Sequence, residues 1–172
     1  MTPTPTYAAT DADTDADLQA MAAQHPAEPP RARLLWTAVV DIGPREALGA
    51  GPQGERFIVP ITGGRFWGAP GLPALSGRVR AGGADRQCLR PDGVRELQAV
   101  YEMETDDGAV LGIDNRVIVD ESVQPGRYAM SRLVVTAPPG PHAWLNRRLL
   151  VGTLQPLRPA RQAVRIQVFV LE

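Results

Sequence analysis

The sequence contains no lysine, one cysteine, two histidines and three each of tryptophan, tyrosine and phenylalanine among its 172 residues. The single cysteine, Cys88, excludes an internal disulfide and a metal site built from several thiolates. The two histidines, His25 and His142, argue against a histidine-rich zinc site, so we expect no metal and no cofactor. No apolar run exceeds a handful of residues, which excludes a membrane-spanning helix.

Charge is low overall and unevenly placed. The formal net charge is -1 and the isoelectric point is near 6.1, which excludes a bulk basic footprint for nucleic acid or an anionic membrane. All 18 cationic residues are arginines. Residues 1–30 hold five of the 19 acidic groups and no arginine, so the remaining 142 residues carry a formal charge of +4. The split predicts an acidic arm attached to a mildly basic body.

The arm is assigned to residues 1–32 and is expected to be flexible, because Thr, Ala, Asp and Pro offer little apolar surface to bury. Residues 17–24 predict a short helix with Asp17 as its N-cap, which the prolines at 26, 29 and 30 would end. This composition is compatible with a flexible terminus that makes no contacts. It is equally compatible with an arm that covers a pocket mouth or a partner subunit. The arm has neither the basic nor the apolar segment of a signal peptide, so we expect a soluble, cytoplasmic protein.

Residues 33–172 are predicted to form one β domain. The 17 glycines and 17 prolines interrupt the chain often enough to exclude long helices. Strands are expected near residues 33–41, 55–61, 64–68, 75–81, 86–90, 95–105, 108–119, 127–136, 143–154 and 163–171.

The clearest local signal is a hairpin. Residues 95–105 and 108–119 alternate in polarity and are joined through an Asp-Gly pair, which is typical of a tight β-turn. Each such strand has one apolar face, and a closed antiparallel barrel of about 8–10 strands buries all these faces without leaving edges. A two-layer β-sandwich is the alternative. If the barrel leaves strand edges unpaired, a homodimer is expected.

Eight sequence pieces, in order, resemble the DUF3237 (UPF0311) family of small bacterial and fungal proteins, whose general activity is not established. The resemblance runs from about Leu34 to Val170 and implies a closed antiparallel barrel with a central cavity. The pieces are Val40-Asp-Ile-Gly43, Ile58-Val-Pro-Ile-Thr-Gly-Gly-Arg-Phe-Trp-Gly68, Gly82-Gly-Ala-Asp85, Arg90-Pro-Asp-Gly-Val94, Thr105-Asp-Asp-Gly108, Asn115-Arg116, Tyr128 and Trp144-Leu-Asn146.

Asn115 is the most informative polar residue, because it falls on the apolar face of its strand between Ile113 and Val117. A buried amide costs roughly 1–3 kcal/mol if it lacks a partner. Asn115 therefore either bonds a neighbour or water, or points into the cavity and holds a ligand oxygen. Asp85, after two glycines, is either a turn residue that caps its own backbone or a general base at the cavity rim.

The remaining candidates come from the matched pieces and one loop. Tyr128 is expected either to donate a phenolic hydrogen bond to a ligand or to close one end of the barrel. His142 is either an exposed loop residue or a second acid–base group that titrates near neutral pH. The candidate ligand-binding residues besides Asn115 are Trp67, Trp144, Asn146 and Arg116, with the two tryptophans as cavity walls.

Two function classes remain open at this point. The first is a cofactor-independent lyase, isomerase or cyclase that transfers protons on a small organic molecule, with allene oxide cyclase and dirigent proteins as analogues of shape alone. Its catalytic residues would be Asp85, Tyr128 and His142. The second is a non-catalytic carrier or sensor of a small apolar ligand. No phosphate-binding loop, dinucleotide fingerprint, catalytic-serine elbow or zinc-protease motif occurs in the sequence.

Overall fold

The computed structural model describes residues 14–172, and the chain divides into a unit that ends at Pro30 and a unit from Arg31 to Glu172. The first unit contains helix α1 (Asp15–Ala23). Its N-cap is Thr14 and not the predicted Asp17, because the Asp17 carboxylate accepts a hydrogen bond from the Thr14 backbone N–H and so completes a capping box. Predictions for residues 1–13 lie outside the described part. Within residues 14–172, no helix is long and apolar enough to cross a membrane.

The second unit is built almost entirely from antiparallel strands, with one short 3-10 helix, η1 (Ala143–Arg147). The strands are β1 (Ala32–Ile42), β2 (Glu46–Gly51), β3 (Gly54–Gly68), β4 (Gly77–Val79), β5 (Ala84–Leu89), β6 (Arg95–Thr105), β7 (Val110–Asp120), β8 (Tyr128–Thr136), β9 (Leu150–Pro156) and β10 (Ala163–Leu171).

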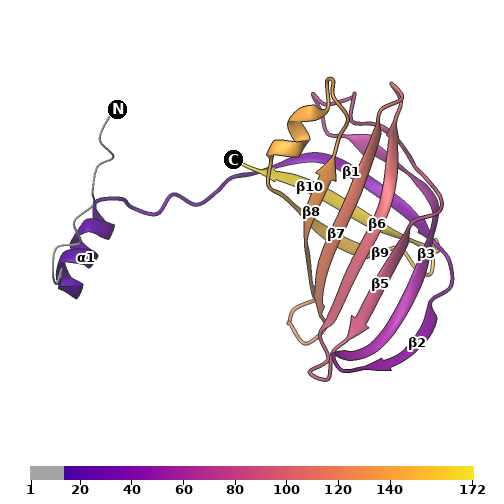
Figure 1. Cartoon of the computed structure of the whole chain (residues 1–172), viewed down its shortest axis with the longest axis horizontal. Coiled ribbons are helices and arrows are strands. Elements are labelled where there is room, and N and C mark those ends of the chain that lie inside the picture. Colours follow the sequence, from indigo (N-terminus) through magenta and orange to yellow (C-terminus); the bar gives the residue numbers. More distant parts are fainter. Residues whose placement is uncertain (1–13) are drawn as a thin grey trace, which may run out of the picture. The chain divides into compact units, whose positions relative to one another are not determined.

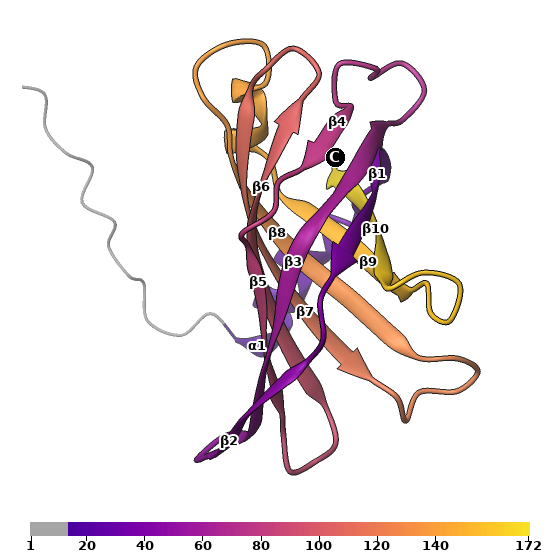
Figure 2. The same ribbon diagram turned by 90° about the vertical axis from the view of Figure 1, so that its right-hand side faces the viewer.

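These strands close into a barrel (Figures 1 and 2). The hydrogen-bonded order is β1, β10, β9, β8, β7 and β6, followed by one position that β4 and β5 share, and then β3. The pairing of β3 with β1 closes the ring. Since β4 and β5 share one place between β3 and β6, eight strand positions surround the lumen. The predicted closed barrel is therefore confirmed over the sandwich. The homodimer, which was expected only for unpaired edges, stays a prediction.

The predicted hairpin is also confirmed, as β6 and β7 pair without a register shift from Arg95 opposite Val119 to Glu104 opposite Val110. Its turn is held by Thr105, whose side chain bonds both Asp107 and the backbone of Ala109. The inward-facing residues of both strands are those that the alternation predicted. They are Leu97, Ala99, Tyr101 and Met103 on β6, and Leu111, Ile113, Asn115, Val117 and Val119 on β7, all buried.

Strand β3 is one long bent strand where the sequence suggested two short ones. Against β1, Asp41 pairs with Gly63 but the next residue, Ile42, pairs with Ile61, so Thr62 is an extra residue in a β-bulge. Gly64 follows with φ of 139°, and a Cβ there would meet the Val39 carbonyl oxygen at 2.2 Å. The bulge shifts the alternation by one position, which buries Phe66 and turns Trp67 outward.

The lumen is filled in one half and hollow in the other. Near η1, large side chains pack into one core, with Trp36, Phe66, Met103, Leu111 and Leu145 essentially inaccessible to solvent. We call this the closed end. Toward the opposite end, a smaller cluster of Leu97, Val117, Val119 and Ala129 packs with Leu154. Between the two clusters the inward side chains leave a cavity, which is the candidate site.

Candidate functional site

The cavity lies inside the barrel and has a volume of about 140 Å³. Most of its wall is aliphatic and comes from β1, β3, β6, β7, β9 and β10. Six side chains with polar groups also line it, from β5, β6, β7 and the segment before β8. They are Asp85, Gln87, Arg95, Tyr101, Asn115 and Arg127. An apolar pocket with a few convergent polar groups is the usual form of a small-molecule site.

Two of these groups flank the smallest residue of the wall. In the strand register, Asp85 of β5 pairs with Ala99 of β6, and Ala99 pairs in turn with Asn115 of β7. Residues in one cross-strand row point to the same side of a sheet, and adjacent strands are about 4.8 Å apart. The Asp85 and Asn115 backbones are therefore about 10 Å apart, with only a methyl group between their side chains.

The Asp85 side chain is held by one hydrogen bond and is otherwise desolvated. The Gln87 amide nitrogen donates to Oδ2 at 2.7 Å, whereas Oδ1 is buried and has no hydrogen-bond partner among residues 14–172. Burial raises the pKa of the carboxyl from 3.8 to about 6, although the Gln87 hydrogen bond, the Gln98 backbone and the Arg95 charge all act to lower that pKa. A carboxyl with a pKa near neutral can both accept and return a proton at physiological pH.

The two glycines before Asp85 bring β5 unusually close to β6. A Cβ at Gly83 would lie 2.5 Å from the Tyr101 Cβ and 2.6 Å from the Val100 carbonyl oxygen, so only glycine fits there. Gly82 adopts φ of 109°, which also favours glycine. The Gly-Gly-Ala-Asp piece thus has a geometric explanation. The glycines allow the start of β5 to pack directly against Tyr101, and Asp85 then faces the lumen.

Asn115 has no exposed surface, and neither its side-chain oxygen nor its side-chain nitrogen has a hydrogen-bond partner in the described residues. Such groups usually mark a site for water or a ligand. Nearby, Tyr101 also lines the cavity, and burial followed by the Asp85 charge raises the pKa of its phenol. The phenol therefore stays protonated, so the cavity wall offers an amide and a hydroxyl as neutral donors.

Arg95 and Gln87 were missed by the sequence reasoning, although the strand alternation could have found them. Arg95 has the same parity as Leu97 and Ala99, and Gln87 has the same parity as Asp85. In β8 the odd-numbered residues from Ala129 onward face inward. Arg127, the residue just before β8, has the same parity. The same alternation that places Asn115 inward therefore also predicts the inward facing of these three side chains.

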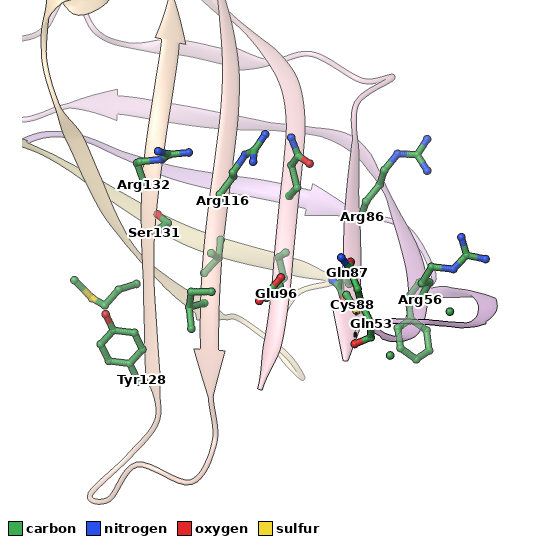
Figure 3. A pocket seen from close by; sticks show the side chains of 18 of the residues that line it. Gln53, Arg56, Arg86, Gln87, Cys88, Glu96, Arg116, Tyr128, Ser131 and Arg132 are labelled. Carbon is green, nitrogen blue, oxygen red and sulfur yellow. Dashed lines mark hydrogen bonds between the residues drawn. The ribbon is translucent and has the colours of Figure 1, made fainter. Parts of the chain in front are cut away.

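Tyr128 and Arg116 do not share the lumen with Asp85. Both are exposed and border a groove of about 1100 Å³ on the outer face of the barrel (Figure 3). Arg116 pairs in register with Arg132 and contacts Asp114 at 3.5 Å, and Arg86 and Arg56 lie farther along the same groove. The outward parity of residues 116 and 128 explains this placement. The charged side chains of the groove are exposed, whereas the lumen desolvates its polar groups.

His142 and Asn146 lie at the closed end, apart from the cavity. The His142 ring, 3% exposed, contacts Asp107 of the β6–β7 turn at 3.0 Å, so it is neither an exposed loop residue nor a neighbour of Asp85. Asn146 bonds the Ala137 backbone twice, accepting at 2.8 Å and donating at 2.9 Å. Both contacts anchor η1 and its preceding loop to the strands beneath.

The expectation that Trp67 and Trp144 wall the cavity is corrected by their positions. Trp67 is 47% exposed, because the bulge at Thr62 reverses the facing of the end of β3. Trp144 lies on η1 and packs against the core of the closed end, because residues 143–147 form a 3-10 helix and the strand begins only at Leu150. Neither tryptophan lines the cavity, and most of the wall is made of aliphatic side chains.

Residues 14–172 contain no cluster of three or more His, Cys, Asp or Glu side chains that could hold a metal ion. The side chains that line the cavity supply one carboxyl, two amides, one phenol and two guanidinium groups. These groups can bind oxygen atoms of a ligand and can move a proton at Asp85.

Comparison with known proteins identifies relatives of the same fold. A family model described as "Protein of unknown function (DUF3237)" matches residues 30–171. The UPF0311 protein RPA1785 of Rhodopseudomonas palustris is 40% identical over 83 residues, which are 48% of this chain and 52% of that protein. The chain thus matches about half the length of this curated relative in sequence. The crystal structure of RPA1785 covers 85% of this chain and 100% of its own, with a TM-score of 0.75 and 31% identity.

Two further structures have the same architecture. A beta-barrel like protein, ABAYE2633, from Acinetobacter baumannii AYE has a TM-score of 0.75 at 27% identity, covering 87% of this chain and all of its own. An enzyme from Penicillium herquei has a TM-score of 0.67 at 21% identity, and the match covers 86% of this chain and 98% of that one. At this identity the likeness shows the fold alone. With the family model matched over nearly the whole barrel unit, this chain belongs to the DUF3237 family.

Proposed function

We propose that the lumen cavity binds a small organic molecule and that the protein is a cofactor-independent enzyme in which Asp85 transfers a proton. The reaction class is elimination or hydration, isomerisation, or cyclisation. The observation that carries the proposal is the pairing of a desolvated carboxyl, Asp85, with an unpartnered amide, Asn115, across Ala99 in an apolar cavity.

The energetics of the two groups support this function. Burying unpartnered polar atoms costs roughly 1–3 kcal/mol per group, so a fold under no functional constraint is better served by aliphatic residues at both positions. Burial also raises the pKa of Asp85 to about 6, which suits a general base. Asn115 Nδ2 supplies a donor for the oxygen on which negative charge develops when a neighbouring C–H is deprotonated.

The Penicillium herquei protein with this fold is described as an enzyme, which is compatible with catalysis in such a barrel but supports it only by analogy. A carrier with the same cavity is the competing function, because most of the wall is aliphatic. The two functions differ in one measurable property: an enzyme labilises a ligand C–H bond, whereas a carrier only binds the ligand.

Deuterium exchange tests the proposal without knowledge of the natural substrate. Small carbonyl compounds are incubated with the protein in D₂O, and loss of the proton signal next to the carbonyl is followed by NMR. The wild type should accelerate exchange for those compounds that bind, and Asp85→Asn should abolish the acceleration. Asp114→Asn, the same substitution on the outer side of β7, is the matched control and should retain it. Binding without exchange would favour the carrier, and full exchange by Asp85→Asn would contradict the role of Asp85.

A further inference from the structure

We propose that the ligand of the lumen cavity is a small carboxylic acid that carries a carbonyl group, with Arg95 and Arg127 binding its carboxylate. The inference rests on the proposed function, because it places the carbonyl at Asn115 and the reacting C–H at Asp85. It adds the chemical class of the substrate and two binding residues.

Arg95 carries the argument. It is the first residue of β6, on the inward-facing parity, and it lines the cavity. Its Nε is buried without a hydrogen-bond partner in the described residues, unlike Arg33, Arg78 and Arg161, which each bind a carboxylate. Guanidinium groups bind carboxylates through paired N–H donors. A buried guanidinium edge without such a partner is therefore suited to a ligand anion.

Arg127 adds a second positive charge to the same cavity. Its two terminal nitrogens are held in place, one by Glu121 at 3.2 Å and the other by the Leu154 carbonyl oxygen at 3.2 Å. These contacts fix the guanidinium at the wall before a ligand arrives. Prior fixation reduces the entropy lost on binding. Glu121 offsets the charge of Arg127, so among the described residues Arg95 is the cavity-lining guanidinium without an ion-pair partner, and Asp85 is the one carboxylate that lines the cavity.

The size and shape of the cavity limit the ligand. A dry cavity of about 150 Å³ holds a molecule as large as benzene, and this one is about 140 Å³. Arg95 and Ala99 lie four residues apart on β6 and line the same cavity. A short carbon chain can then reach from the guanidinium groups to the gap above Ala99. The ligand is thus a compact acid of about benzene size.

The chemical step is a balanced proton transfer. The C–H bond next to the carbonyl breaks, the proton goes to the free Oδ1 of Asp85, and the electron pair moves to the carbonyl oxygen. The resulting enolate oxygen accepts a hydrogen bond from Asn115 Nδ2. Return of the proton from Asp85 to the same or another carbon restores the carboxylate and completes an isomerisation without a co-reactant.

A pair of probes that differ only in charge tests the inference on the wild-type protein. 2-Oxobutanoate and 2-oxobutanamide have the same number of non-hydrogen atoms, and both carry a ketone with exchangeable neighbouring protons. Dissociation constants from NMR titration should favour the carboxylate by roughly tenfold or more, as expected for a charge-assisted contact with arginine. Equal affinity for the two probes, or binding of neither, would overturn the inference.

Three variants locate the effect. Arg95→Gln should remove most of the preference for 2-oxobutanoate, and Arg127→Gln should reduce it. Arg116→Gln, on the outer face, should leave the preference unchanged. Thermal melts of all three variants identify any that fail to fold, and the comparison of the two probes on the wild type needs none of them. A preference that persists in both Arg95→Gln and Arg127→Gln would overturn the assignment.

Deuterium exchange separates this inference from the proposed function. If the amide binds and exchanges as fast as the carboxylate, and Asp85→Asn stops both, the proton-transfer function stands and the carboxylate inference fails. If the carboxylate binds selectively through Arg95 without any exchange, the carboxylate inference stands and the function is that of a carrier.

Discussion

Asp85 of β5 and Asn115 of β7 lie in one cross-strand row on either side of Ala99, and within the part of the chain that the structure describes, one oxygen of Asp85 and both amide atoms of Asn115 are buried without a hydrogen-bond partner. The pair is surrounded by aliphatic side chains on a rigid antiparallel barrel. This relationship has consequences for stability as well as for binding, because burial of such groups is unfavourable unless something binds them.

Replacing Asp85 with Asn should stabilise the protein at neutral and higher pH. The folded-state pKa of about 6 lies above the unfolded value of 3.8, so the folded state binds the proton more tightly. The associated stability is complete below the unfolded pKa and is lost as the pH rises through about 6, a loss of roughly 2–3 kcal/mol. The free energy of unfolding of Asp85→Asn should therefore exceed that of the wild type above pH 7 and equal it below about pH 4. Urea unfolding of both proteins across this range measures the difference, and a difference that grows toward low pH would refute the account of Asp85.

Asn115→Leu should raise stability and abolish ligand binding. The substitution keeps the volume, removes two unpartnered polar atoms, and should gain about 1–2 kcal/mol in the free energy of unfolding. Asn146→Leu is the matched control, because it breaks two hydrogen bonds to Ala137 and should destabilise the closed end instead. A loss of more than about 2 kcal/mol in Asn115→Leu would mean that its amide is a structural group.

Ala99→Leu should fill the gap between Asp85 and Asn115. Because the longer side chain extends into an existing cavity, the free energy of unfolding should fall little or even rise, while affinity for any ligand of this cavity should fall by at least about tenfold. Val100→Leu, one residue along and 51% exposed on the outer face, should change neither stability nor affinity appreciably. Retained affinity in a folded Ala99→Leu protein would mean that the ligand binds elsewhere.

His142 should matter for stability and not for proton transfer. The His142–Asp107 contact joins the loop before η1 to the β6–β7 turn at the closed end, away from Asp85. The Thr105 hydrogen bond, followed by that of His142, lowers the pKa of Asp107, so the ionised carboxylate contributes stability that is lost as the pH falls through this pKa. His142→Phe should lower the Tm and leave exchange rates unchanged. Loss of exchange in a folded His142→Phe protein would restore a catalytic role for this residue.

Much of this arrangement follows from the sequence, because the alternation of side chains is a local property of a strand. The β6–β7 hairpin, its inward residues and the burial of Asn115 were all predicted from polarity and one Asp-Gly turn. The closed barrel follows from the need to bury one apolar face on every strand.

The errors arose where a local pattern depends on distant contacts. The bulge at Thr62 depends on how β3 pairs with β1, so the outward turn of Trp67 is not visible in the segment itself. Residues 143–147 form a 3-10 helix because Asn146 bonds the end of β8, nine residues earlier in the chain. Arg95 and Arg127 fall on the inward parity at strand ends, so the alternation indicates their facing, but their meeting with Asp85 and Asn115 in one cavity depends on the pairing of several strands.

The central claim is that a small molecule binds in the lumen beside Asn115, and the chain has only two asparagines with which to test it. Selective ¹⁵N labelling of asparagine gives two side-chain amide signals, one from the cavity and one from Asn146 at the closed end. Addition of 2-oxobutanoate should shift the Asn115 signal and leave that of Asn146 in place. A shift of the Asn146 signal alone, or no change in the Asn115 signal at saturating 2-oxobutanoate, would contradict the claim.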